Sequence, residues 1–181
     1  KLGLAAQLSA RGVPAWTPGV WPEGMQAWGG PRAVRGFRAA VHVPYAPTTF
    51  ALYEHAQAGL LTFIPTPRLL LHLYATRGLF FQATQHDGVT TGEGTAHLTA
   101  GVLGATEWDA PENAPAFVQF ASLDDLEAML KRKDADLDAR RRRLREWAEA
   151  HTAATRRRWR AIDEIFARGR NGSTESAAAL Y

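Results

Sequence analysis

Residues 40–65 read AVHVPYAPTTFALYEHAQAGLLTFIP, and this stretch decides the fold class. An apolar run over residues 40–43 is ended by a proline and followed by a loop that contains two threonines. Residues 50–58 then favour a helix that stops at Gly59, since glycine suits the left-handed turn at a helix end. Residues 60–64 are apolar again and favour a second strand. Two apolar strands joined by one short helix predict a parallel pair with a right-handed crossover.

The loop before this helix is a candidate anion site. In parallel α/β units the ligand lies at the carboxyl ends of the strands, here where the loop after Val43 meets the helix. Threonines in this loop suit the N-cap position, and the free N–H groups behind them attract a phosphate or diphosphate. Glu54 follows about 8 Å along the helix axis. Its carboxylate would accept hydrogen bonds from both hydroxyls of a ribose attached to that diphosphate.

The same residues resemble the donor-binding motif in the C-terminal half of GT-B glycosyltransferases. The resemblance rests on Glu54-His-Ala-Gln-Ala-Gly59, on Pro44-Tyr45 with its hydroxyl-rich turn, and on Phe63-Ile-Pro-Thr-Pro67. Later blocks around Trp108 and over residues 117–126 fit as well, so the resemblance covers about Arg32 to Phe166. It implies a Rossmann-like parallel sheet flanked by helices.

The resemblance also implies an activity, the transfer of a sugar from a nucleotide diphosphate sugar to a hydroxyl acceptor. The backbone N–H groups of Thr48, Thr49 and Phe50 would hold the diphosphate in place of a metal, and Glu54 would bind the ribose. No metal or other cofactor is expected. The chain begins at Lys1 without a methionine and fits only one GT-B half, so we expect a preceding half, and no catalytic residue is assigned.

Three side chains near the motif are further expected donor contacts. His42 closes the first strand, Tyr45 lies in the loop, and Arg38 belongs to a predicted arginine-bearing helix over residues 31–38. A core histidine with satisfied hydrogen bonds is an equal interpretation of His42. A guanidinium would complement the diphosphate charge, although the arginines of this helix more often form a solvated face.

The remaining pattern predicts elements that surround the motif. The residues of helix 50–58 expected on one face are Phe50, Tyr53 and Ala56 or Gln57. A helix over residues 68–75 follows with Thr66 as N-cap, then a strand at 117–120 and a helix capped by Ser122. From 136 to about 168 the apolar spacing predicts one long amphipathic helix or two in series. The expected domains are 1–133 for donor binding, an arginine-rich helical segment at 134–170, and a disordered tail at 171–181.

Composition and charge limit the other classes. The chain has 181 residues, no cysteine and a net charge of +3, so disulfides and thiolate zinc sites are excluded. Residues 134–170 hold eleven arginines and seven acidic residues. Asp134-Ala-Asp136 is interpreted as helix-start acids in preference to a metal motif. The arginine-rich face suggests an anionic membrane surface as a partner, and no nucleic acid is expected.

Two alternatives to the glycosyltransferase stay open. One is a non-catalytic Rossmann-like binding or scaffold module. The other, which the sequence favours least, is a nucleic-acid-binding protein built on the arginine-rich helix. A glycosyltransferase of this kind would be cytoplasmic or associated with the Golgi or another membrane.

Overall fold

The computed structural model describes residues 3–17, 30, 33–34, 36–46, 49–77, 103 and 106–178, with residues 169–178 described as backbone only. Within these residues the elements are five helices longer than one turn, two short 3-10 helices and three strands. Thr48, one of the residues expected to hold the diphosphate, lies outside the described residues.

The sheet is parallel, and helices connect and flank its strands, as predicted for this α/β chain. Its strands are β1 (Ala40–Val41), β2 (Thr62–Pro65) and β3 (Phe117–Phe120), in the order β1-β2-β3. Ala40 pairs with Thr62, and Thr62 pairs in turn with Phe117. The helix α2 (Phe50–Gln57) connects β1 to β2, so the predicted strand, helix and parallel strand are confirmed.

Local sequence signals explain where the helices begin and end. Gly59 has φ 76° and ends the turn after α2, a conformation that glycine adopts without steric cost. The helix α3 (Pro67–Arg77) begins where the Leu69 N–H donates to the Thr66 hydroxyl at 3.3 Å. Ser122 accepts from the Asp125 N–H at 3.1 Å and caps α5 (Leu123–Leu130). The predicted caps at Thr66 and Ser122 are therefore confirmed.

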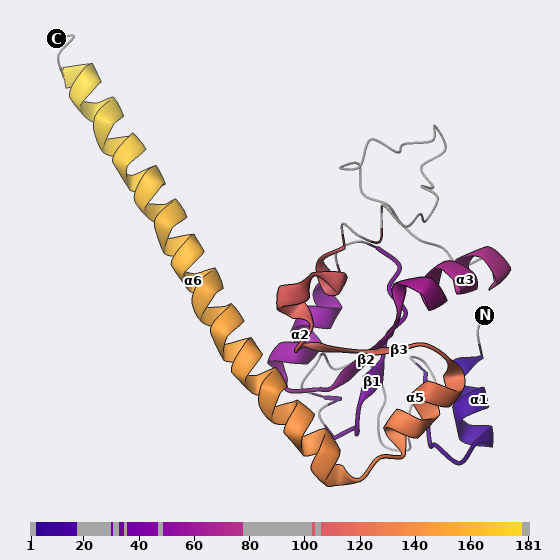
Figure 1. Cartoon of the computed structure of the whole chain (residues 1–181). Helices are drawn as coiled ribbons and strands as arrows, with labels where there is room; N and C mark the ends of the chain where they lie inside the picture. Colours follow the sequence, from indigo (N-terminus) through magenta and orange to yellow (C-terminus); the bar gives the residue numbers. More distant parts are fainter. Residues whose placement is uncertain are drawn as a thin grey trace.

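The core lies on both faces of the central strand. All four residues of β2 are buried, because β1 and β3 cover its edges and helices cover its faces. Figure 1 shows α2 and α6 on one side of the sheet and α1 (Leu4–Ala10) and α5 on the other. One apolar cluster joins these layers; its largest fully buried members are Trp108, Phe63, Leu52, Ile64, Leu70, Leu103, Leu126, Leu137 and Leu144.

The helix α6 (Asp134–Ala178) packs on the domain only with its first half. Leu137 and Leu144 are 1% and 0% exposed and belong to the core cluster. Further along, Trp159 and Phe166 are 62% and 68% exposed, and Figure 1 shows the helix projecting past α2 away from the sheet. One helix therefore carries both a core-forming segment and an unpacked segment.

Two expectations about side chains and helices are corrected. The described residues of the predicted helix 31–38 form turns, with the Phe37 N–H donating to the Val34 carbonyl at 3.0 Å, and Gly36 weakens any helix there. Phe50 was expected on one apolar face with Tyr53, yet it is 81% exposed. The buried face of α2 consists instead of Leu52, His55 and Ala56.

Candidate functional site

The start of α2 is the candidate site, and Thr49 is its central residue. Thr49 is the N-cap, with extended backbone angles of φ −137° and ψ 103°, but its side chain makes no capping hydrogen bond. The residue is 3% exposed, and its hydroxyl oxygen is buried without a hydrogen-bond partner among the described residues. A buried hydroxyl without a partner costs free energy. A ligand that accepts or donates a hydrogen bond at this hydroxyl would remove that cost.

The first turn of α2 supplies further groups at the same place. The N–H groups of a first helical turn have no partners within the helix and carry the positive end of its dipole. Phe50 directs a mostly exposed aromatic ring into solvent at this turn. Glu54 is also exposed and lies about 8 Å along the axis from Thr49. Thr49, Phe50 and Glu54 thus belong to one short helix and its N-cap, with Thr49 buried and the other two side chains exposed.

The loop that leads into α2 is held by a tryptophan far along the chain. Trp108, in the 3-10 helix η2 (Glu107–Asp109), is 1% exposed and donates its Nε1–H to the Ala46 carbonyl at 3.2 Å. Ala46 and Pro44 are buried, while Tyr45 between them is 51% exposed. The loop therefore presents the tyrosine to solvent from a fixed backbone.

His42 lies beside this loop but is neutral at physiological pH. Burial lowers the pKa of His42 to about 4, with a smaller contribution from the charge of the neighbouring His55. Its ring centroid is 6.3 Å from that of Tyr45, and its Nε2 is buried without a partner among the described residues. A neutral imidazole can exchange a hydrogen bond with a ligand, but it adds no positive charge for a phosphate.

Arg38 lies at the other end of β1 from Thr49. It precedes the strand, and its guanidinium donates to the Asp134 carboxylate at 2.5 Å and also to the Arg132 carbonyl. Its own carbonyl accepts from Arg141 at 3.0 Å. These bonds tie the start of β1 to the start of α6, so Arg38 is not at the start of α2, although it lines a pocket that His42 also lines.

Of the two acidic residues in the first turn of α6, Asp134 is engaged in the Arg38 contact. Asp134 and Asp136 occupy the first turn, where carboxylates offset the helix dipole. Among the described residues, no group of three or more His, Asp or Glu side chains is arranged to hold a metal ion. No helix in the described part of the chain is long and apolar enough to cross a membrane.

An aromatic stack fixes α2 against α6 and was not foreseen. The Tyr53 ring stacks on His151 and Trp147 at centroid distances of 5.5 and 6.2 Å, and those two rings stack on each other at 4.8 Å. The Tyr53 hydroxyl accepts from the Asn113 side-chain amide at 3.2 Å. Burial, aided by the negative charge of Glu107, raises the pKa of Tyr53. Asn113, Trp147 and His151 are 60 or more residues away from Tyr53 in sequence, and no local pattern indicates these contacts.

Comparisons with known proteins add no identification. No family model, no curated protein and no solved structure matches the chain.

Proposed function

We propose that this chain is the nucleotide-sugar-binding half of a GT-B glycosyltransferase, with a Rossmann-like sheet and a long C-terminal helix. The observation that carries the proposal is the buried, unpartnered hydroxyl of Thr49 at the N-terminus of α2. It lies at the carboxyl edge of a parallel sheet, which is where open α/β sheets bind ligands. An anionic group there would accept hydrogen bonds from the first-turn N–H groups and from the Thr49 hydroxyl.

The proposed roles follow the geometry of α2. The N–H groups at Thr48, Thr49 and Phe50 bind the donor diphosphate, and Glu54 binds the ribose hydroxyls. The exposed Phe50 ring offers a face on which the nucleobase or the sugar stacks. Tyr45, which is exposed on the loop that Trp108 anchors, is a further proposed contact.

The proposed reaction needs no metal. As the bond between the sugar and the diphosphate breaks, negative charge develops on the departing nucleotide diphosphate. Backbone N–H groups already aimed at that charge stabilise the transition state without reorganising. The oxygen of the acceptor hydroxyl forms the new glycosidic bond, and its proton passes to a general base or to water.

A thermal-shift titration tests the proposal. We expect one of UDP, GDP or ADP to raise the melting temperature progressively with concentration, because the nucleotide binds only the folded state. Glu54→Gln should reduce this shift, since the amide is a poorer acceptor for two ribose hydroxyls. The matched control is Glu149→Gln, which makes the same change at an exposed glutamate of α6. This variant should leave the shift unchanged.

The outcomes separate the proposal from its alternative. Equal shifts in wild type and in Glu54→Gln would remove Glu54 from the site, and the absence of any shift would reject nucleotide binding by this chain. Nucleotide binding without sugar transfer by the chain joined to a second GT-B half would favour a non-catalytic binding module.

We further propose that the projecting part of α6 binds an anionic membrane surface. Arg156, Arg157 and Arg160 are exposed there, next to the exposed Trp159. Arginine attracts anionic headgroups, and aromatic side chains insert at the membrane interface. Removal of these arginines should abolish co-sedimentation with anionic vesicles, and unchanged sedimentation would reject the membrane proposal.

A further inference from the structure

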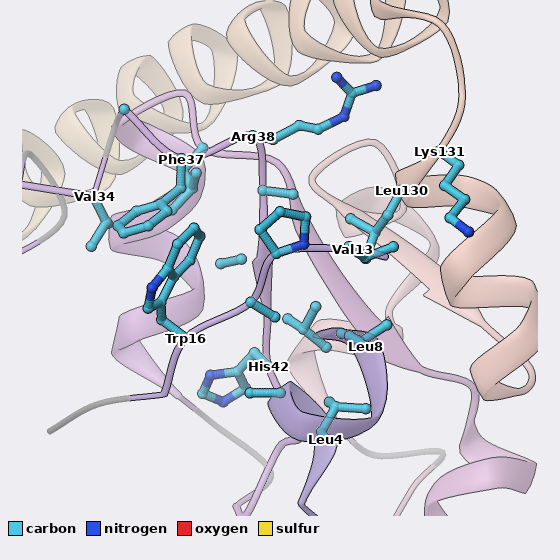
Figure 2. A pocket seen from close by; sticks show the side chains of 18 of the residues that line it. Leu4, Leu8, Val13, Trp16, Val34, Phe37, Arg38, His42, Leu130 and Lys131 are labelled. Carbon is cyan, nitrogen blue, oxygen red and sulfur yellow. The ribbon is translucent and has the colours of Figure 1, made fainter. Parts of the chain in front are cut away.

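A pocket lies beside β1, and Thr49, Phe50 and Glu54 are not among the residues that line it. It has a volume of about 940 Å³, which is within the range of small-molecule sites. Figure 2 shows it between α1, the segment around Phe37, strand β1 and the end of α5. Its apolar lining includes Leu4, Leu8, Val13, Trp16, Phe37 and Leu130.

One end of this pocket is basic. Arg38, Lys131, Arg132 and Lys133 line it there, against the single carboxylate of Asp134. Arg38 is bonded to Asp134, and Lys131 donates to Glu127 at 2.7 Å. Among the described residues, the side chains of Arg132 and Lys133 have neither an ion pair nor a hydrogen bond. The basic end therefore retains positive charge that no side chain of the described part neutralises.

The other end of the pocket carries a hydrogen-bonding atom without a partner. His42 lines the pocket beyond the carboxyl end of β1, and Figure 2 shows its ring near Leu4, well separated from Arg38 and Lys131. The Nε2 of His42 is buried and has no hydrogen-bond partner among the described residues. Four residues of extended chain separate Arg38 from His42, which corresponds to about 13 Å. Buried polar atoms in proteins are normally hydrogen-bonded, so the unpartnered Nε2 of His42 indicates that a ligand in the pocket bonds to it.

From these three features we infer that the pocket binds a single-chain anionic amphiphile. Its carboxylate or phosphate head lies at Arg132 and Lys133, its alkyl chain runs along Leu8, Val13 and Trp16, and a polar group at the far end of the chain meets Nε2 of His42. The inference does not depend on the proposed glycosyltransferase activity, because Thr49, Phe50 and Glu54 do not line this pocket. His42 and Arg38, which the sequence suggested as donor contacts, do line it.

Three ligands of equal chain length test the inference: decanoate, decyl phosphate and decanol. Titrations are followed by calorimetry below the micelle concentration of each ligand. We expect both anions to bind more tightly than decanol, and the tighter of the two identifies the head group. The double variant Arg132→Ala/Lys133→Ala should weaken anion binding by about threefold to tenfold, as for two exposed charge contacts, and leave decanol binding unchanged.

Two further variants locate the bound chain. Val13→Trp fills the apolar part of the pocket and should abolish binding of all three ligands, and Ala15→Phe serves if the first variant fails to fold by circular dichroism. The double variant Trp159→Ala/Phe166→Ala removes two exposed aromatic residues of α6 and should leave the affinity for all three ligands unchanged. Equal affinity for decanoate and decanol, full anion binding by the basic double variant, or loss of binding in the α6 variant would each overturn the inference.

His42 is tested with decanoate that carries a terminal hydroxyl. The hydroxylated ligand should bind more tightly than decanoate to wild type. His42→Phe should remove this preference while keeping decanoate binding. If the hydroxyl gives no advantage in wild type, the polar end of the proposed ligand is rejected.

Discussion

Thr49 is either a structural helix cap or a ligand-binding residue, and replacing it by valine distinguishes the two roles. The two roles predict changes of opposite sign in the free energy of unfolding. Valine has nearly the shape of threonine but lacks the hydroxyl. If the hydroxyl capped α2, its loss would cost about 1 kcal/mol, as for other N-caps. In the structure the hydroxyl makes no cap bond and is buried without a partner among the described residues. A buried polar group of this kind costs about 1–3 kcal/mol, so Thr49→Val should make the nucleotide-free protein more stable by about 1 kcal/mol.

The same change should weaken nucleotide binding. The proposed diphosphate bonds to the Thr49 hydroxyl, and a hydrogen bond to a charged group contributes about 1.5–3 kcal/mol. The dissociation constant should therefore rise by about tenfold or more. Urea unfolding measures the first effect, and nucleotide titration measures the second.

Ser122→Ala provides the contrast for Thr49→Val. Ser122 does cap its helix, accepting from the Asp125 N–H at 3.1 Å, and its loss should destabilise by about 1 kcal/mol. Destabilisation by Thr49→Val of the same size would show that Thr49 is a structural cap and would refute the reasoning. A more stable variant with unchanged nucleotide affinity would refute the functional half alone.

Three other predictions concern pH, the anchored loop and α6. The pKa of His42 is about 4 when folded and near 6.5 when unfolded, so the unfolded state takes up its proton first as pH falls. Stability is then lost below about pH 6.5, by about 2 kcal/mol at pH 5, and urea unfolding of His42→Asn should show a smaller loss over this range. Trp108→Phe leaves the buried Ala46 carbonyl without its 3.2 Å donor and should destabilise by about 1–3 kcal/mol, and a loss below about 0.5 kcal/mol would show that the bond is dispensable. On α6, Leu144→Ala should cost about 2–5 kcal/mol and Ile165→Ala less than about 0.5 kcal/mol, because the first side chain is 0% and the second 67% exposed; equal losses would contradict the unpacked state of the projecting segment.

The parts of the fold that local signals control could be predicted from the sequence. Gly59 ends its helix because of its own backbone freedom, and Thr66 and Ser122 begin theirs through bonds to residues three positions later. The parallel pairing of β1 and β2 followed from a helix between two apolar runs.

Contacts between distant residues could not be predicted in the same way. The Trp108 bond to Ala46 spans 62 positions and the Arg38 bond to Asp134 spans 96, and each depends on how complete elements pack. Phe50 was misplaced for a related reason. Periodicity identifies an apolar face, but the sheet and α6 determine which face of α2 is buried, and they bury Leu52 and Ala56 instead.

The stack of Tyr53, Trp147 and His151 joins α6 to α2, the helix that is proposed to bind the nucleotide, so that α6 can act as a lever that turns about the stack. From Trp147 to Ala178 the helix extends about 46 Å at 1.5 Å per residue. A tilt of α2 that rotates α6 by about 5° at the stack displaces the far end by about 4 Å. A small movement at the proposed donor site would thus become a larger displacement at the far end of α6. A pair of fluorophores, one near Thr49 and one at the end of α6, would report nucleotide binding as a change in energy transfer.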